Sequence, residues 1–492
     1  MPPSIDEARA AVERAVRALI ESADAHEKFA EFESVAWVRL LAVGRAVAVL
    51  FLAQRACAPR PVEYHHAEQR WSLAEWRSTE LGTRFGKVDF KRRVGRRCGY
   101  FRRGKADLPL DRELGLVGGF SLGAATALAR LCAQMAFAQA RATCRAFFEW
   151  APSPRATLRI LDAIGGHARE FLSQVPSPKN DGEVLVLEVD GGGAPAISSR
   201  ELRRRRQPKK HRRGRRDRRD RRRANPRPRR TKGKKSKNSK VAFVGVLFTL
   251  RRQPDGTMEG PLNKRMIGTF ESHRALFEWL HAEAIKRGYG IKRTVFIADG
   301  SEHIWALQKE FFPLAEPCID WWHVIEYLWT AAGCLYGEAS PERRAWVDEQ
   351  KGRLRRGRVN LVLETMAVAL AKIAKTGPGN KGRRERLLDT LEYLTEHQHR
   401  MTYARLRRDD LDIGSGVVEG AVRNLVRMRL DGPGMRWGRD RAETMLHLRC
   451  VLLNGEWEDF ERYLAKQIIT LAASPAPTRT HDAKPNPLAE AA

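Results

Sequence analysis

The chain has 492 residues, enough for two or three domains with large apolar cores. Its formal net charge of +31 at pH 7 favours a polyanionic partner. Seven scattered cysteines with no C-x-x-C pair indicate reduced intracellular thiols and argue against a zinc knuckle.

The first part of the chain, residues 5 to 56, is rich in Ala and Glu at helical spacing, which predicts two helices that pack together or dimerise. The most apolar stretch, VAWVRLLAVGRAVAVLFLAQRA, is interrupted by Arg39 and Arg45. These charges favour an amphipathic or buried helix over a membrane span. Because no signal peptide opens the chain, we expect a soluble protein of the cytoplasm or nucleoid, with no membrane partner.

A change of texture follows in STELGTRFGKVDFKRRVGRRCGYFRRG, where Gly breaks and alternating segments predict a small basic β element. Residues 1–118 are therefore expected to form an N-terminal helical and small β region. From Ser121 to about Leu172 the pattern is helical again, with a Pro-Ser-Pro break. This region, 119–178, is either a helix-turn-helix that reads DNA or an ordinary helical hairpin.

The stretch DGEVLVLEVDGGGAP, at 181–195, predicts a short strand buried on both faces, with Glu188 as its one polar interruption. The strand is expected to end at Asp190, before three glycines. These glycines lack the following helix and the Lys-Ser/Thr of a phosphate loop, so they indicate only close approach of the backbone. An aspartate at a strand end is often just a turn former, so its function depends on whether other carboxylates accompany it.

A highly basic segment comes next. Between Arg203 and Lys240 there are 23 Lys or Arg and two Asp, a net charge of +21, which leaves +10 for the rest of the chain. Since the segment has almost no apolar residue, we expect a disordered arm. Such an arm would bind nucleic acid without regard to sequence and with a steep salt dependence; the alternative is a solvated linker.

After the arm, the pattern predicts strands at 241–250, around 265–269, at 293–300 and at 317–320, with helices between them. The expected fold class is α/β, a mixed five-stranded sheet with helices against it. This gives a core at 179–323, an all-helical insertion at 324–410, a C-terminal helical part of the core at 411–470 and a disordered tail at 471–492.

Three carboxylates stand out. The strand TVFIADGS ends in Asp299 as the earlier strand ends in Asp190, and Glu419 lies in GSGVVEGAVRNLVRMRLDGPGMRWG. If the two strands are neighbours, both aspartates emerge at one edge of the sheet. Three hard oxygen donors suit Mg²⁺ or Mn²⁺, and two such ions could activate a water or a DNA 3′-hydroxyl for displacement at phosphorus.

Glu419 is predicted in the first turns of a helix that begins at Ser415. Four-residue spacing would place Arg423 and Arg427 on the same face, where they could hold a phosphate beside the metal. The alternative is a surface acid paired with Arg423.

In these motifs the chain resembles the DDE transposases of bacterial insertion sequences, and among them the ISKra-type group. The resemblance covers about residues 75 to 460 and rests on VDGGG, ADGSEHIW, IDWWHVIEYLW, GSGVVEG, GMRWGRDRAETMLHLR and PLDRELGLVGGFSLG. It implies an RNase H-like core, a metal-binding triad of Asp190, Asp299 and Glu419, and cutting and joining of element ends without a covalent intermediate. By family analogy it also implies a homodimer on paired ends.

Two secondary groups accompany the triad. Asp320 and His323 match a pair that the family places near the active site, where the histidine could contact a phosphate or tune a ligand. The alternative is that Asp320 caps the next helix while Trp321 and Trp322 fill a core. Trp437, with Arg436, Arg439 and Arg441, could stack on an unpaired base and grip the backbone, although burial is the commoner use of such a ring.

Taken together, the sequence predicts a magnesium-dependent transposase that acts on terminal inverted repeats and target DNA. A structure-specific nuclease on the same fold is one alternative. The other is a catalytically inactive nucleic-acid-binding protein whose carboxylates are structural.

Overall fold

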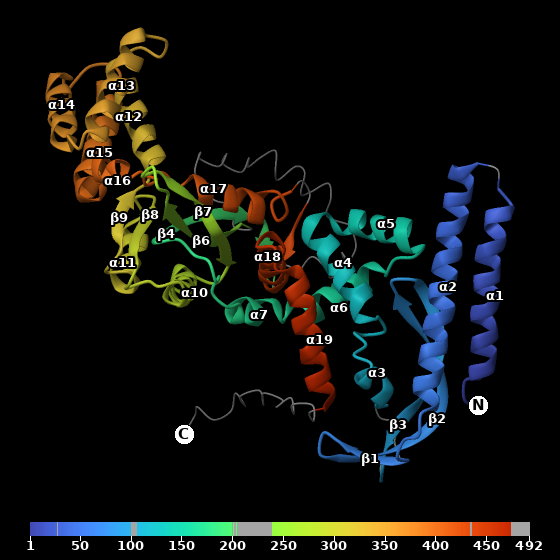
Figure 1. Cartoon of the computed structure of the whole chain (residues 1–492). Coiled ribbons are helices and arrows are strands. Elements are labelled where there is room, and N and C mark those ends of the chain that lie inside the picture. The colour runs from blue at the N-terminus through green and yellow to red at the C-terminus, as the bar shows by residue number, and fades with distance from the viewer. Residues whose placement is uncertain are drawn as a thin grey trace, which may run out of the picture. The chain divides into compact units, whose positions relative to one another are not determined.

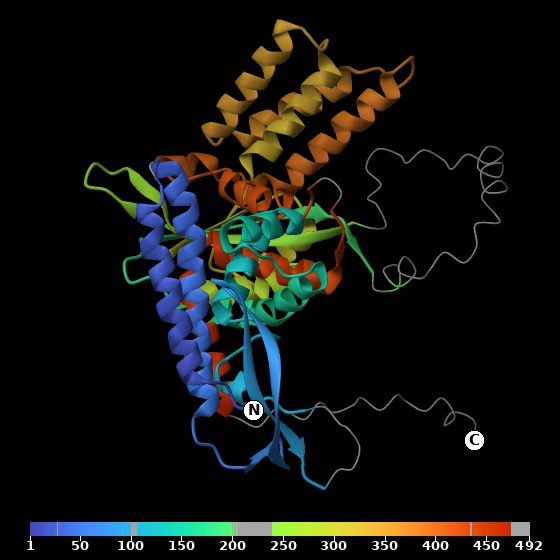
Figure 2. The same ribbon diagram turned by 90° about the vertical axis from the view of Figure 1, so that its right-hand side faces the viewer.

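The computed structural model describes residues 1–26, 28–99, 106–198, 239–432 and 435–473, together with Arg200 and Arg203. The chain divides into two compact units. One contains Met1–His167 and the C-terminal part from Trp457, and the other is Ala168–Glu456. Most of the predicted basic arm, 204–238, and the tail beyond 473 lie outside the described residues. Figures 1 and 2 show the elements of each unit.

The first unit begins with α1 (Ile5–Asp24) and α2 (Phe29–Cys57), which pack against each other. By length and composition alone, α2 could span a membrane. However, Arg45 of α2 donates to the Phe85 carbonyl oxygen and forms an ion pair with Glu149, both at 2.9 Å. Because a charged side chain at the middle of α2 is engaged within the unit, the helix is compatible with a soluble protein.

An antiparallel sheet follows, formed by β1 (Glu63–His66), β2 (Gln69–Thr83) and β3 (Gly86–Arg97). It begins earlier in the chain than the predicted basic β element. Its buried side chains, among them Leu81 and Phe90, form one core cluster with Leu52 of α2. The sheet is therefore held to the helices by apolar packing.

The rest of this unit is helical: α3 (Pro109–Glu113), α4 (Leu122–Gln134), α5 (Phe137–Phe148), α6 (Pro154–Gly165) and α19 (Trp457–Ala473). Ser121 and Ser153 begin α4 and α6, and each side-chain oxygen accepts a backbone N–H three residues on. The single helix expected between Ser121 and Trp150 is broken, because Met135 adopts an extended conformation that ends α4. Neither Gly nor Pro marks this break, so local sequence did not predict it.

The second unit confirms the predicted mixed α/β class. Its five-stranded sheet has the order β7-β6-β4-β8-β9. The strands are β4 (Val184–Ala194), β6 (Lys240–Arg252), β7 (Met258–Thr269), β8 (Arg293–Ala298) and β9 (Glu316–Ile319). β4 pairs antiparallel with β6 and parallel with β8. The sheet therefore changes from antiparallel to parallel at β4.

Helices cover both faces of this sheet, as can be followed in Figure 1. The α10 helix (His273–Lys286) packs on one face, where a Cβ at Gly245 would meet Leu276 and Leu280. The α18 helix (Arg439–Leu453) packs on the other, where Gly268 approaches Leu446. Because alternate residues of a strand face opposite sides of the sheet, each side chain of β4 can be assigned to the α10 face or to the α18 face.

After β9 the chain is helical as far as Arg408, and Figure 1 shows these helices grouped beyond the end of the sheet. The elements are α12 (Trp321–Leu335), α13 (Pro341–Arg355), α14 (Val359–Lys372), α15 (Asn380–His397), the 3₁₀ turn η2 (Gln398–Arg400) and α16 (Tyr403–Arg408). The Tyr403 hydroxyl donates to the Ile319 carbonyl oxygen of β9 at 3.0 Å. This bond fixes the last helix of the insertion to the edge of the sheet.

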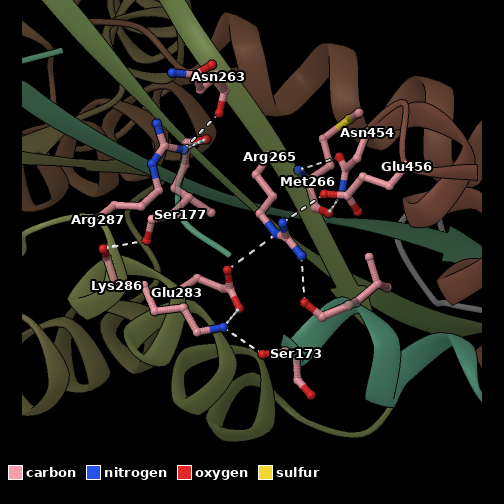
Figure 3. A network of polar contacts seen from close by, with 12 residues as sticks. Ser173, Ser177, Asn263, Arg265, Met266, Glu283, Lys286, Arg287, Asn454 and Glu456 are labelled. Atoms are coloured by element: carbon pink, nitrogen blue, oxygen red, sulfur yellow. Dashed lines mark hydrogen bonds and ion pairs between the residues drawn. The ribbon is translucent and has the colours of Figure 1, made fainter. Parts of the chain in front are cut away.

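A buried ionic network braces the opposite edge of the sheet (Figure 3). Arg265 of β7 donates to the Leu172 carbonyl oxygen of α7 (Ala168–Gln174) at 2.6 Å and pairs with Glu456 at 2.8 Å. Its Nε lies 3.3 Å from Glu283 of α10, which also pairs with Lys286 at 2.8 Å. One guanidinium thus joins a strand, a helix on the sheet and both chain ends of this unit.

Candidate active site at the edge of the sheet

Asp190 lies within β4 and not at its end, which corrects the expectation that the strand stops before the glycines. Gly191, Gly192 and Gly193 continue the ladder opposite Phe243, Ala242 and Val241. The glycines are needed for packing, because a Cβ at Gly192 would come within 2.8 Å of Val422. A helix therefore lies directly on the strand beside Asp190.

Asp190 and Asp299 occupy matching positions on neighbouring parallel strands. The register pairs Val189 of β4 with Ala298 of β8, so the next residue on each strand is an aspartate. Both follow the parallel ladder at its carboxyl end and face the same side of the sheet. The Asp190 Oδ1 accepts the Gly191 N–H at 2.6 Å, and the Asp299 Oδ1 accepts the Ser301 N–H at 3.0 Å.

Glu419 comes from α17 (Gly416–Val422), the helix that packs on β4. Asp190 pairs with Val244, two residues along β6 from the Ala242 that pairs with Gly192, so Asp190 faces α17. The Glu419 Oε1 accepts a hydrogen bond from the Ser415 hydroxyl at 3.4 Å. Ser415 begins the helix as predicted, but its side chain contacts Glu419 and does not cap the backbone.

The three carboxylates influence one another electrostatically. Burial raises the pKa of Asp190, and the charges of Asp299 and Glu419 raise it further, while the Gly191 N–H and His323 oppose the shift. Carboxylates that repel in this way are stabilised by a proton or by a cation between them, and their hard oxygens suit Mg²⁺ or Mn²⁺. Across the described residues, no three His, Cys, Asp or Glu side chains stand close enough together to hold a metal ion. The donor chemistry fits such a cation, and closing on it would require side-chain movement.

The predicted stripe of Glu419, Arg423 and Arg427 at α-helical spacing is not formed. The α-helix ends at Val422, and a π-helical turn, η3, spans Arg423–Arg427. The wider turn displaces Arg427 from the line through Glu419 and Arg423. Both arginines are exposed.

Asp320 and His323 form a compact pair at the start of α12. Asp320 is fully buried and accepts hydrogen bonds from the His323 N–H at 2.9 Å, the His323 ring at 2.7 Å and the Ser415 N–H at 2.7 Å. Burial alone would raise the Asp320 pKa, but these hydrogen bonds lower it below its ordinary value. The bond to Asp320 raises the pKa of His323 to about 9 against the effect of burial, with a further contribution from Asp299. His323 is therefore a cation at neutral pH.

The two interpretations of this motif are compatible. Asp320 caps α12, and Trp321 is buried, as the structural reading expects. The same Asp320 joins α12 to the loop that precedes Glu419, and its partner His323 lies within electrostatic reach of Asp190. Trp322 is 57% exposed and does not fill a core.

Trp437 is not available for stacking on a base. Its side chain is 6% exposed, its Nε1 donates to the Leu430 carbonyl oxygen at 2.9 Å, and the Arg429 guanidinium lies 5.0 Å from its ring. It forms β10 (Trp437–Gly438), which pairs with β5 (Ala196–Ile197). The flanking Arg436 and Arg439 are exposed.

Glu188 is a site residue to which the sequence assigned no role. It is fully buried two positions before Asp190 on the same face, and its Oε2 accepts the Val418 N–H of α17 at 2.7 Å. Burial raises its pKa to about 8, with contributions from Asp412, Asp320 and Glu419. The signal in the sequence was the single polar residue within an apolar strand.

The insertion places aromatic side chains near Asp299. The rings of Tyr327 on α12 and Tyr393 on α15 stack with centroids 3.8 Å apart. Burial raises the pKa of both, and the charge of Asp299 contributes to each shift. The helical insertion is therefore part of the surroundings of the carboxylates.

Comparison with known proteins adds no relative to this description: no family model matches the chain, and no significant match is found among curated proteins.

Proposed function

We propose that this chain is a DDE transposase that cuts and joins the ends of an insertion sequence by metal-dependent phosphoryl transfer. The observation that carries the proposal is the register of β4 and β8, which places Asp190 and Asp299 side by side, with Glu419 on the helix that covers the same face. Three carboxylates from distant parts of the sequence are thereby directed to one edge of the sheet, as metal-dependent phosphoryl transfer requires.

The fold supports an RNase H-like core. Three antiparallel strands lead into two parallel ones, and helices cover both faces of the sheet. A fold hosts many activities, however, so the proposal depends on the site.

Asp190, Asp299 and Glu419 would hold the metal ions. When bound, two Mg²⁺ or Mn²⁺ ions supply activation of a water or DNA 3′-hydroxyl and stabilisation of the leaving oxygen. The chain's own part is to position the three carboxylates. Ser415 orients Glu419 through a 3.4 Å hydrogen bond, and Glu188 holds α17 on β4.

His323 would contact the phosphate. It is held in position by the fully buried Asp320, and its side chain remains 41% exposed. Its positive charge lies beside Asp190 and Asp299, where an anionic DNA backbone would otherwise be repelled.

The remaining proposed DNA contacts either bind the backbone without reading its sequence or follow from the family resemblance. Exposed arginines near the site, namely Arg423, Arg427, Arg436 and Arg439, would bind the backbone, and so would the basic arm. The helices between Ser121 and Leu172 would read the terminal repeats. By family analogy the active form would be a homodimer on paired ends, associated with the nucleoid.

The test is Asp299→Asn, assayed with a candidate element end and Mg²⁺. We expect DNA binding to be kept and strand cleavage and joining to be lost, by roughly a thousandfold or more if electrostatic stabilisation by the metals is removed. The matched control is Glu302→Gln, which removes an exposed carboxylate in the first turn of the next helix and should leave cleavage unchanged.

The outcomes separate the alternatives. Cleavage without joining would favour a structure-specific nuclease. A wild-type chain that binds DNA and never cuts it would favour an inactive binding protein, as would cleavage that survives Asp299→Asn and so traces to a contaminant.

A further inference from the structure

We propose that the helical insertion carries a separate DNA-binding surface, the arginine patch, formed by Arg356, Arg358, Arg407 and Arg408. It would grip the phosphate backbone of a DNA duplex without reading its sequence. The inference depends on the proposed function only in taking DNA as the ligand.

Two segments far apart in the sequence meet at this patch. Gly357, in the turn between α13 and α14, has a φ of +73°, and a Cβ built there would lie 3.2 Å from the Ala404 Cβ of α16. Residues three and four positions apart share a helix face, so Arg407 and Arg408 lie on the side of α16 that carries Ala404. Arg356 and Arg358 flank Gly357 in the chain. The backbones of the four arginines are therefore brought together around one point of contact, and the Arg356 guanidinium lies over Gly352, one turn back along α13.

The charge of the patch is not neutralised within the protein. All four arginines are exposed, and in the described part of the chain none of them has a carboxylate as an ion-pair partner. The neighbouring acids are engaged elsewhere: Asp409 pairs with Arg293 at 2.8 Å, and Asp410 accepts the Met258 N–H at 2.8 Å. If the patch were only a solvated basic surface, its arginines would be expected to form ion pairs with these neighbouring acids.

Two further arginines tie the patch to β9 and to α12. Arg405 of α16 pairs with Glu316 of β9 at 3.0 Å. The Arg355 guanidinium lies 5.1 Å from the ring of Trp321, the residue directly after Asp320. The patch is thus held beside the first residue of β9 and the beginning of α12, the helix that Asp320 caps and that carries His323.

A DNA backbone is the polyanion that this arrangement fits. A guanidinium group can donate two hydrogen bonds to the oxygens of one phosphate, and it keeps its charge at any physiological pH. Several neighbouring arginines can therefore bind successive phosphates of one backbone. Each phosphate neutralised releases counterions, so every arginine should contribute about one unit to the salt dependence of binding.

The experiment uses the full chain carrying Arg356→Gln, Arg358→Gln, Arg407→Gln and Arg408→Gln. Binding to a labelled duplex of random sequence is followed by fluorescence anisotropy in EDTA over a range of NaCl concentrations. We expect the slope of log K against log[salt] to fall in magnitude by about 3 to 4 and the affinity near 0.15 M salt to drop by at least about tenfold.

The matched control removes the same charge at the other end of α14, through Lys372→Gln, Lys375→Gln, Lys381→Gln and Arg386→Gln, all exposed positions. Because α14 has 14 residues, Lys372 at its end lies on the order of 20 Å from the patch. The other three positions follow in the loop after α14 and in the first half of α15. For this control variant, the slope of log K against log[salt] should change by less than about one unit. Equal losses in the two variants would show that only net charge matters and would overturn the patch, provided circular dichroism shows both folded.

The result is separable from that of the transposase test, because EDTA excludes cleavage from the measurement. If the chain never cuts DNA but the patch variant and its control differ in salt slope, the proposed function is wrong and the arginine patch is supported. A chain that cuts element ends while the patch variant binds with an unchanged slope would support the proposed function and contradict the patch.

Discussion

Glu188 and Val418 join the central strand of the second unit to the helix that carries Glu419. The Glu188 Oε2 accepts the Val418 N–H at 2.7 Å, and this carboxyl is fully buried. The bond connects residues 230 positions apart. Glu188 lies two residues before Asp190 on the same face of β4. Because Val418 directly precedes Glu419, this hydrogen bond helps to fix the position of Glu419 relative to β4.

Replacing Glu188 should therefore affect both stability and activity. With a pKa raised to about 8, Glu188 is mostly protonated at pH 7, so Glu188→Gln keeps its shape, charge and acceptor oxygen. We expect Glu188→Gln to retain most cleavage. Glu188→Ala should lose about 1–3 kcal/mol of unfolding free energy and at least about tenfold in cleavage, since the Val418 N–H is left buried without its acceptor. Urea unfolding and a strand-cleavage assay give the two readouts; equal activity of the two variants would remove the positioning role.

Arg265 should be among the most sensitive positions for folding of the second unit. Arg265→Met leaves Glu283, whose side chain is 3% exposed, without its strand partner. Breaking a buried pair in this way costs roughly 3–5 kcal/mol. Thermal or urea unfolding measures the loss, and the double variant Arg265→Met with Glu283→Gln should recover part of it.

The control for this prediction is Arg274→Met. Arg274 forms ion pairs with Glu278 and Glu310 while its side chain is 53% exposed, so the change should cost no more than about 1 kcal/mol. Similar losses for the two arginines would mean that the Arg265 network contributes no more than a surface pair.

Acid should destabilise the second unit through Asp181. Burial alone would raise the pKa of Asp181, but hydrogen bonds from Arg287, Thr249 and Asn263 hold it well below its ordinary value. A pKa depressed in the folded state contributes stability that is fully present above the unfolded pKa of about 3.9 and is lost as pH falls below it. Asp181→Asn lacks this titration. The stability gap between wild type and variant should thus be large at pH 7 and narrow below about pH 4, as urea unfolding at several pH values can show; a constant gap would contradict the assignment.

Deleting residues 204–238, most of the basic arm, should weaken binding to all duplexes alike and flatten the salt slope by several units. The deletion leaves Lys240 in β6, so the sheet is retained. Anisotropy with cognate and random duplexes makes the comparison. Loss of affinity for cognate ends alone would show that the arm reads sequence.

The sequence by itself determined the strands and the residues worth testing. Apolar runs located all five strands of the mixed sheet, because burial on two faces demands such runs. For β7 the run at 265–269 marked only the buried part, since the strand begins at Met258 with residues that are not buried. The repeated pattern of apolar residues followed by Asp identified Asp190 and Asp299, and Ser415 located the start of the helix that carries Glu419.

Only the tertiary structure decided how these pieces meet. The continuation of β4 through Gly191–Gly193 depends on pairing with β6, and the space that Gly192 leaves is filled by Val422 of α17. The burial of Trp437 arises from pairing between short strands more than two hundred positions apart. The role of Glu188 depends on an N–H supplied by a distant helix. Local patterns record the preferences of single segments, whereas register, face and partner are fixed by contacts between segments, so physical reasoning on one sequence reaches the candidates and the fold supplies their geometry.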